Sequence, residues 1–339
     1  MNGKDLHIDG FSPNCLVGVT GAVARSKYMI KNINRIYFHH SYTYQNNGEI
    51  KYLPDVNSLN ICFTREIPIS KDSFIERLFY YYALTHSYMI YSDFEYMVND
   101  IARLNAFGEP IMIEIDFFFM KKHRFYKKVH DQHMMIIYDV DLEQKQFSVC
   151  EAVFGQIKIS FEEYYEYFKD VNENRNRGIF VLRLSKKNGY DSHKIRIDYF
   201  IKDIEKTLEN LVYSDGLSLF NQFSNDFINF LEKGNYDNNF FIPGMWVFMC
   251  DSMNNVNFIN EFKNDYIDFE STALDEVRKC SIITNRKWFY LTMALNDIGK
   301  YKIEDISKAL KSIEDADTEL VRNLKLLKND LIEYNNKHH

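Results

Sequence analysis

The sequence predicts an α+β protein, in which a buried helix and an antiparallel sheet form a first domain and a helical second domain follows. A helix-start signal precedes small and apolar residues over residues 12–30. Short β-branched and aromatic runs, typical of strands, occupy residues 110–184. Helical periodicity dominates after a polar stretch near residue 188. We therefore expect domains at residues 1–187 and 188–339.

The first expected element is a central helix. Ser12 is a suitable N-cap, and Pro13 occupies the first helical position, which needs no N–H donor. Gly18 and Gly21 interrupt an otherwise apolar run and indicate close packing against other backbone. Because the two glycines lower helical propensity, tertiary packing must hold this helix.

The sheet is expected after two amphipathic helices at residues 73–91 and 93–108. A polar turn at residues 141–145 would join two of its strands, and Ser160 with Glu163 forms a capping-box signature for one more helix. No role follows for the β-rich segments at residues 36–44 and 59–67. The strands are expected at residues 110–119, 133–140, 146–152, 156–160 and 178–184.

The second domain is expected to consist of helices, with no fixed-period repeat. Candidate helices cover residues 197–212, 217–234, a run through 246–253, 271–295 and 306–334.

The composition excludes several classes of protein. Hydrophobic residues make up 46% and aromatic residues 16%, far from the composition of disordered chains. The formal charge of −7 argues against nucleic acid and anionic membranes as partners. The 5 cysteines are scattered without CxxC spacing, which indicates neither a disulfide framework nor a zinc site. The cysteines therefore indicate thiols in a reducing compartment. The first ten residues are polar and no apolar run reaches membrane-spanning length, so we expect a cytoplasmic protein.

Cys15 is the candidate nucleophile. A thiol reacts as the thiolate, and a helix amino terminus stabilises a thiolate through its free N–H groups and partial positive charge. Taken alone, a cysteine in a packed helix is more often a small apolar residue, and that interpretation fits Cys62, Cys150, Cys250 and Cys280.

A base and an orienting carboxylate lie on two expected strands. His133 begins one strand and Glu151 lies near the end of the next, across the hairpin. The order Cys, His, carboxylate, with Cys15 on an early helix and the other two on adjacent strands, is the papain-like arrangement. An isolated surface His or strand-end Glu would mean little, but the joint placement of a triad favours catalysis.

A metal site at His130, Asp131 and His133 is the competing interpretation of this segment, but no second ligand pair accompanies it, and we expect no metal. A basic segment immediately precedes His133 in an otherwise acidic chain. It is either a solvated loop or a rim that binds an anionic partner, and it contains Lys121, Lys122, Arg124, Lys127 and Lys128.

The Asn14–Cys15 pair with its following helix, together with residues 109–168, resembles the butirosin biosynthesis protein H family. The resemblance covers the chain to about residue 185. It implies a papain-like fold and an acyltransferase of thiotemplated natural-product (antibiotic) biosynthesis. Such an enzyme moves an acyl group from a carrier-protein thioester to an amine, forming an amide. Cys15 and His133 match the nucleophile and base, and Glu151 stands where the family usually has Asp.

The chain departs from papain-like enzymes at Asp9, where a Gln often supplies an oxyanion donor, because an ionised Asp can only accept. We therefore assign the oxyanion hole to the backbone N–H of Cys15 and the side chain of Asn14.

Together with the predicted triad, the resemblance implies an acyltransferase with an acyl or peptidyl carrier protein and a small amine as partners. No cofactor of its own is expected, since phosphopantetheine arrives on the donor carrier. Two alternatives remain open. One is a papain-like hydrolase, acting as peptidase, amidase or thioesterase, and the other is a noncatalytic metabolite-binding protein.

Overall fold

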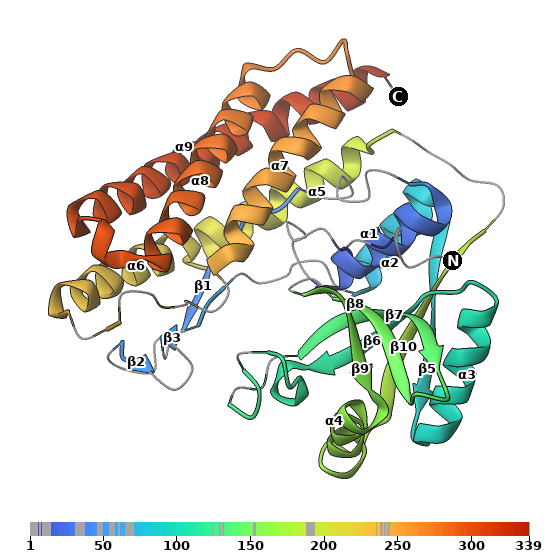
Figure 1. Ribbon diagram of the computed structural model, residues 1–339. Helices are drawn as coiled ribbons and strands as arrows, with labels where there is room; N and C mark the ends of the chain where they lie inside the picture. The colour runs from blue at the N-terminus through green and yellow to red at the C-terminus, as the bar shows by residue number, and fades with distance from the viewer. Residues whose placement is uncertain are drawn as a thin grey trace. The chain divides into compact units, whose positions relative to one another are not determined.

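The computed structural model describes most of the chain, with gaps that fall mainly in the first 70 residues (Figure 1). The described residues are 6, 8, 15–30, 38–45, 50–53, 58–59, 62–64, 71–123, 125–128, 130, 132–151, 154–187, 194–234, 236–237, 240, 242 and 245–338.

The described residues fall into two compact units. The sheet unit comprises those of Met1–Ile33 and Asp72–Ser192, and the helical unit comprises those of Asn34–Lys71 and His193–His339. The segment after the first helix therefore groups with the carboxyl-terminal helices. The division at residues 187 and 188 stays a prediction.

The sheet unit contains a six-stranded antiparallel sheet in the order β5-β10-β6-β7-β8-β9. This arrangement bears out the mixed α+β class and the predicted antiparallel sheet. The strands are β5 (Leu84–Tyr91), β6 (Ile111–Asp116), β7 (Gln132–Asp141), β8 (Gln146–Glu151), β9 (Gly155–Ser160) and β10 (Ile179–Lys186).

Helix α1 (Cys15–Tyr28) is buried as expected. All residues from Val17 to Ala24 are inaccessible to solvent, so neighbouring structure covers every side of the helix over two turns. The small residues Gly18 and Gly21 lie in this buried stretch, where they allow close approach of other backbone.

Three further helices belong to the sheet unit. Helix α3 (Phe94–Ala106) begins at Asp93, whose carboxylate accepts a hydrogen bond from the Tyr96 N–H. Helix α4 (Phe161–Glu173) begins at Ser160, whose hydroxyl accepts from the Glu163 N–H at 3.1 Å, and this confirms the predicted capping residue. Helix α2 (Lys71–Tyr82) is the third.

The prediction of one helix over residues 73–91 is wrong in its second half. Helix α2 ends at Tyr82, Ala83 adopts a left-handed conformation (φ 53°), and the chain continues as β5. All eight residues of β5 pair with β10. The β-branched and aromatic residues of this stretch fit a strand, and tertiary pairing outweighs their apparent helical period.

The strand predicted over residues 110–119 is shorter than expected. It ends at Asp116, and residues Phe117–Phe119 form a 3₁₀ turn (η4). The Asp116 carboxylate caps this turn by accepting the Phe118 N–H at 3.0 Å. A short polar side chain that bonds the following backbone thus competes with continued strand pairing.

The helical unit contains the helices expected for the second domain. They are α5 (Ile197–Leu208), continued by a π-helical turn (η5, Glu209–Tyr213), α6 (Gly216–Lys233), α7 (Met245–Asp265), α8 (Thr272–Asn296) and α9 (Ile303–His338), with a 3₁₀ turn (η6, Ile298–Lys300) before α9. In the described part of the chain, none of the helices is long and apolar enough to cross a membrane.

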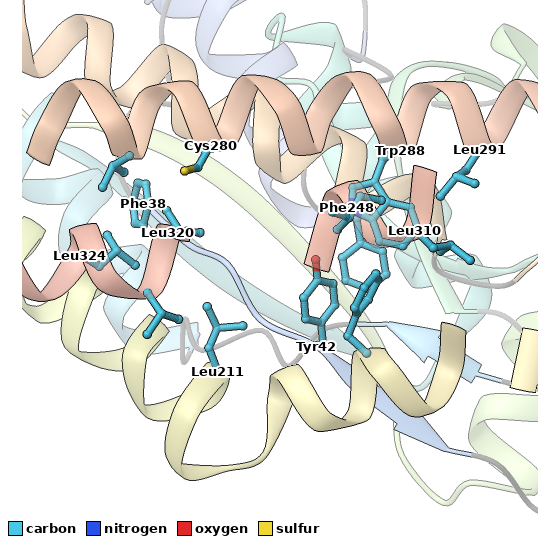
Figure 2. Close-up of a cluster of buried hydrophobic side chains, with 14 of the residues drawn as sticks. Phe38, Tyr42, Leu211, Phe248, Cys280, Trp288, Leu291, Leu310, Leu320 and Leu324 are labelled. Atoms are coloured by element: carbon cyan, nitrogen blue, oxygen red, sulfur yellow. The ribbon is translucent and has the colours of Figure 1, made fainter. Parts of the chain in front are cut away.

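Residues near position 40 contribute to the core of the helical unit. Tyr42 lies among side chains from several helices, and Figure 2 shows it beside Phe248 and Trp288. Short strands follow it, β1 (Thr43–Gln45) with β4 (Cys62–Thr64) and β2 (Tyr52–Leu53) with β3 (Ser58–Leu59). The described residues of the β-rich segments for which the sequence predicts no role include Thr43, Tyr44, Leu59 and Cys62–Thr64, which lie in these strands.

Candidate active site

Cys15 is the first residue of α1, as expected for the nucleophile. Its thiol is free and half-buried. The N–H groups in the first turn of a helix have no intrahelical acceptor, so they can stabilise negative charge beside the sulfur. Ser12, Pro13 and Asn14, which carry the predicted helix start and part of the oxyanion hole, lie outside the described residues, as does Asp9.

His133 is the second residue of β7, where it pairs with Ile115 of β6. The register between β7 and β8 then determines which residues of β8 lie near it. Ile136 pairs with Cys150, so Glu151, one residue further along β8, is a diagonal neighbour of His133 across the ladder.

The side chain of Glu151 is completely buried, and each oxygen of its carboxylate makes one contact. Oε1 lies 3.0 Å from Nε2 of His133. Oε2 accepts a hydrogen bond from the backbone N–H of Phe154 at 3.0 Å, within the turn that joins β8 to β9. The turn thus orients the carboxylate toward the imidazole.

The three predicted triad residues are therefore brought together from α1, β7 and β8. Burial alone lowers the pKa of His133, but hydrogen bonds with Cys15 and Glu151, and the charges of both groups, raise it from 6.5 to about 9. The imidazole consequently holds its proton at neutral pH. Because Nε2 faces Glu151, Nδ1 is the ring nitrogen left for the thiol.

The other described cysteine side chains match their interpretation as small core residues. Cys150, Cys250 and Cys280 are buried and free. Burial raises the pKa of the Cys150 thiol, and it raises that of Cys280 to about 11. Both thiols are therefore protonated and poorly reactive near neutral pH. The side chain of Cys62 lies outside the described part of the molecule.

The basic segment lies on the surface of the sheet unit. Lys121, Lys122, Lys127 and Lys128 are exposed, whereas Arg124 is outside the described residues. The Lys127 ammonium lies 2.8 Å from the Glu166 carboxylate of α4, so part of its charge is compensated. The role of these side chains in carrier binding stays a prediction.

Sequence reasoning missed a second histidine–carboxylate pair. His130 Nδ1 lies 2.9 Å from Oδ2 of the buried Asp116, and Arg175 contacts the same oxygen at 3.1 Å. The sequence gives no sign of this cluster, because Arg175 lies 59 residues after Asp116 and meets it only in the folded chain. Within the described ranges no group of His, Cys, Asp and Glu side chains is placed to hold a metal ion, and Asp131 lies outside them.

Comparison of the chain with protein-family models finds no match, and neither does comparison with curated proteins.

Proposed function

We propose that this protein is a cysteine acyltransferase of papain-like fold, which moves an acyl group from a carrier-protein thioester to a small amine. The observation that carries this proposal is the convergence of Cys15, His133 and Glu151 from three elements. A thiol at a helix start, an imidazole protonated at neutral pH and a buried carboxylate on the far ring nitrogen form the set that nucleophilic thiol catalysis needs.

In the first half-reaction the Cys15 thiolate attacks the thioester carbonyl carbon. The oxyanion that forms accepts from the N–H groups at the start of α1. The carbon–sulfur bond to the phosphopantetheine of the carrier then breaks. The departing thiolate takes the proton of the His133 imidazolium, which leaves Cys15 acylated and His133 neutral.

In the second half-reaction the amine attacks the acyl-enzyme. Neutral His133 accepts the proton that the amine nitrogen loses, while the bond between the acyl carbon and the Cys15 sulfur breaks and the thiolate returns. Glu151 stabilises the imidazolium at both ends of the cycle. The Phe154 N–H donates to the other carboxylate oxygen, which supports the longer Glu side chain in this position.

The exposed lysines of the basic segment favour a carrier protein with an acidic surface as the acyl donor. Carrier proteins with acidic surfaces would meet the exposed side chains of Lys121, Lys122 and Lys128, which belong to the same unit as Cys15. The nucleophile has to stay a free thiol, which a reducing compartment favours, and we place the reaction in the cytoplasm, within a thiotemplated pathway of antibiotic biosynthesis.

The test is intact-mass spectrometry of the full chain after mixing with a synthetic acyl-pantetheine thioester, first alone and then with a panel of amines. We expect a stable gain of the acyl mass and its discharge as amide when the accepted amine is added. Discharge at an equal rate in water alone would identify a hydrolase instead. No covalent gain in mass with any thioester would identify a noncatalytic binding protein.

A further inference from the structure

We propose that Phe117 is a positioning residue, which holds the ring plane of His133 and stabilises its protonated form, and that His123 fixes Phe117 by stacking on it. The inference rests on the proposed role of His133 as the catalytic base. None of the sequence patterns points to either residue.

The proposal begins from three rings in series. The Phe117 ring centroid lies 4.6 Å from that of His133, with 33° between the planes. The Phe117 ring also stacks on His123, at 3.9 Å and 16°. Both Phe117 and His123 are buried, so neither ring can move away without opening the packed structure.

His123 acts here as a neutral aromatic plate. Its Nδ1 accepts a hydrogen bond from the backbone N–H of Phe125 at 3.2 Å, which requires that this nitrogen carry no proton. The bond also fixes the ring against the turn that follows η4. Phe125 adds an edge-on ring contact at 4.9 Å. The His123 ring that stacks on Phe117 is thus held in place by the backbone N–H of Phe125.

His123 is also connected to Glu151, through Phe154. The Phe154 ring meets the His123 ring edge-on at 5.7 Å, and the Phe154 N–H donates to Glu151 Oε2. Glu151 in turn lies against His133. A closed loop of contacts therefore runs from the imidazole through Phe117, His123 and Phe154 to the carboxylate, and back to the imidazole.

Two consequences follow for His133. Cys15 and Glu151 contact the edge of its ring. A neighbour against the flat face adds a second restraint on rotation of the ring plane. An aromatic face also attracts a cation through its quadrupole, so Phe117 favours the imidazolium over the neutral ring. Cys15 from α1 and Glu151 from β8 are the ionisable groups that act most strongly on His133, and the ring of Phe117 from η4 lies beside it.

The experiment is a titration of His133 by NMR in the full-length chain with labelled histidine, with its resonance assigned by comparison with His133→Gln. Phe117→Leu keeps an apolar side chain and removes the ring. We expect it to lower the apparent pKa of His133 by about half a unit, roughly a threefold loss of proton affinity. Phe117→Tyr, which keeps an aromatic face, should restore the wild-type value.

Phe119→Leu is the matched control. Phe119 lies in the same 3₁₀ turn and is equally buried, but its ring contacts Phe118, His130 and Tyr167 instead of His133. It should cost stability and leave the titration of His133 unchanged. If Phe117→Leu fails to fold, Phe117→Met supplies the same test.

An unchanged titration in a folded Phe117→Leu or Phe117→Met protein would overturn the inference. That outcome is distinct from failure of the proposed function. Cys15→Ala should also lower the pKa of His133, because it removes one of the groups that raise it. If Cys15→Ala leaves the titration unchanged, the pairing of Cys15 with His133 is wrong, whatever Phe117 does.

Discussion

Glu151 shows how a single buried side chain determines the state of the proposed catalytic base. With one carboxylate oxygen held by the Phe154 N–H, the other is directed at His133 Nε2. A proton on that nitrogen is therefore favoured over a wide pH range. Asp139, another carboxylate of β7, lies six residues further along the strand, at about 20 Å from His133, and is too far away to orient the imidazole.

Replacing Glu151 by Gln should slow acyl-enzyme formation, because an amide can orient the imidazole but cannot supply the charge that stabilises its proton. We expect a loss of about 10-fold, smaller than that of His133→Ala. Single-turnover acylation by the synthetic thioester measures it. Asp139→Asn is the control and should be silent. The orienting role is wrong if the two variants behave alike.

At the residue scale, Cys15, His133 and Glu151 could be proposed from sequence because helix and strand signals place each near an element end. Phe117 and His123 could not, since their meeting depends on a 3₁₀ turn and on the course of residues 120–128. The contacts of Asp116 with His130 and Arg175 could not be predicted from sequence either, because they form only in the folded chain.

At the scale of elements, the turn between β8 and β9 determines the direction of the Glu151 carboxylate. Gly155 pairs with Glu151 and adopts a left-handed conformation (φ 66°), which side chains of other residues resist. The strand pattern predicted β8 and β9 correctly. The exact turn geometry, and with it the direction of the carboxylate, depends on this backbone conformation.

Gly155→Ala should therefore destabilise the protein by about 1 kcal/mol and also slow acyl-enzyme formation, because the turn would relax and Glu151 would shift. Gly234→Ala is a matched control, since Gly234 ends α6 with φ 68° and likewise has open space around it. It should cost similar stability in urea unfolding without a change in acylation rate. Equal kinetic effects of both would contradict a specific role for the turn.

Strand β5 illustrates why element types can be predicted wrongly. Its eight residues read as the end of an amphipathic helix when only local periodicity is considered. Pairing with β10, which lies almost 90 residues later in the chain, decides the outcome. Such a long-range contact leaves no local signal in the sequence.

At the scale of the whole molecule, the helical unit depends on a segment from the first quarter of the chain. Asp317 of α9 is fully buried and accepts hydrogen bonds from Tyr42 and Thr284, and His40 Nε2 lies 3.1 Å from it. Asn255 bonds both the N–H and the carbonyl of His39. The sequence assigns residues 36–44 no role because the partners of His39 and Tyr42 named here lie 216 and 275 residues further along the chain.

Asp317→Asn should destabilise the protein by about 3 kcal/mol, because it replaces a buried carboxylate that accepts two hydrogen bonds and leaves its partners mismatched. Tyr42→Phe, which deletes one donor, should cost about 1 kcal/mol. Urea unfolding of both variants measures the difference. If Asp317→Asn is as stable as the wild type, the buried network does not hold this segment in the helical unit.

The basic segment is expected to bind a macromolecular partner, the carrier protein. Reversing Lys122 and Lys128 to Glu should weaken kcat/KM about 10-fold for a carrier-bound thioester, and the loss should shrink as salt rises. A short thioester without carrier is the control substrate and should react as before. Equal losses for both substrates would mean that the lysines support the site itself, and no loss would mean that they form a solvated loop.

The measurement that tests the central claim most directly is the site and rate of acylation in a single turnover. After mixing with the synthetic thioester and quenching in acid, peptide mapping should locate the acyl group on Cys15. Cys15→Ala should remain unacylated, Cys150→Ala should load like the wild type, and His133→Ala should load at least ~10²-fold more slowly. Acylation of another residue, or wild-type loading in Cys15→Ala or His133→Ala, would contradict the account.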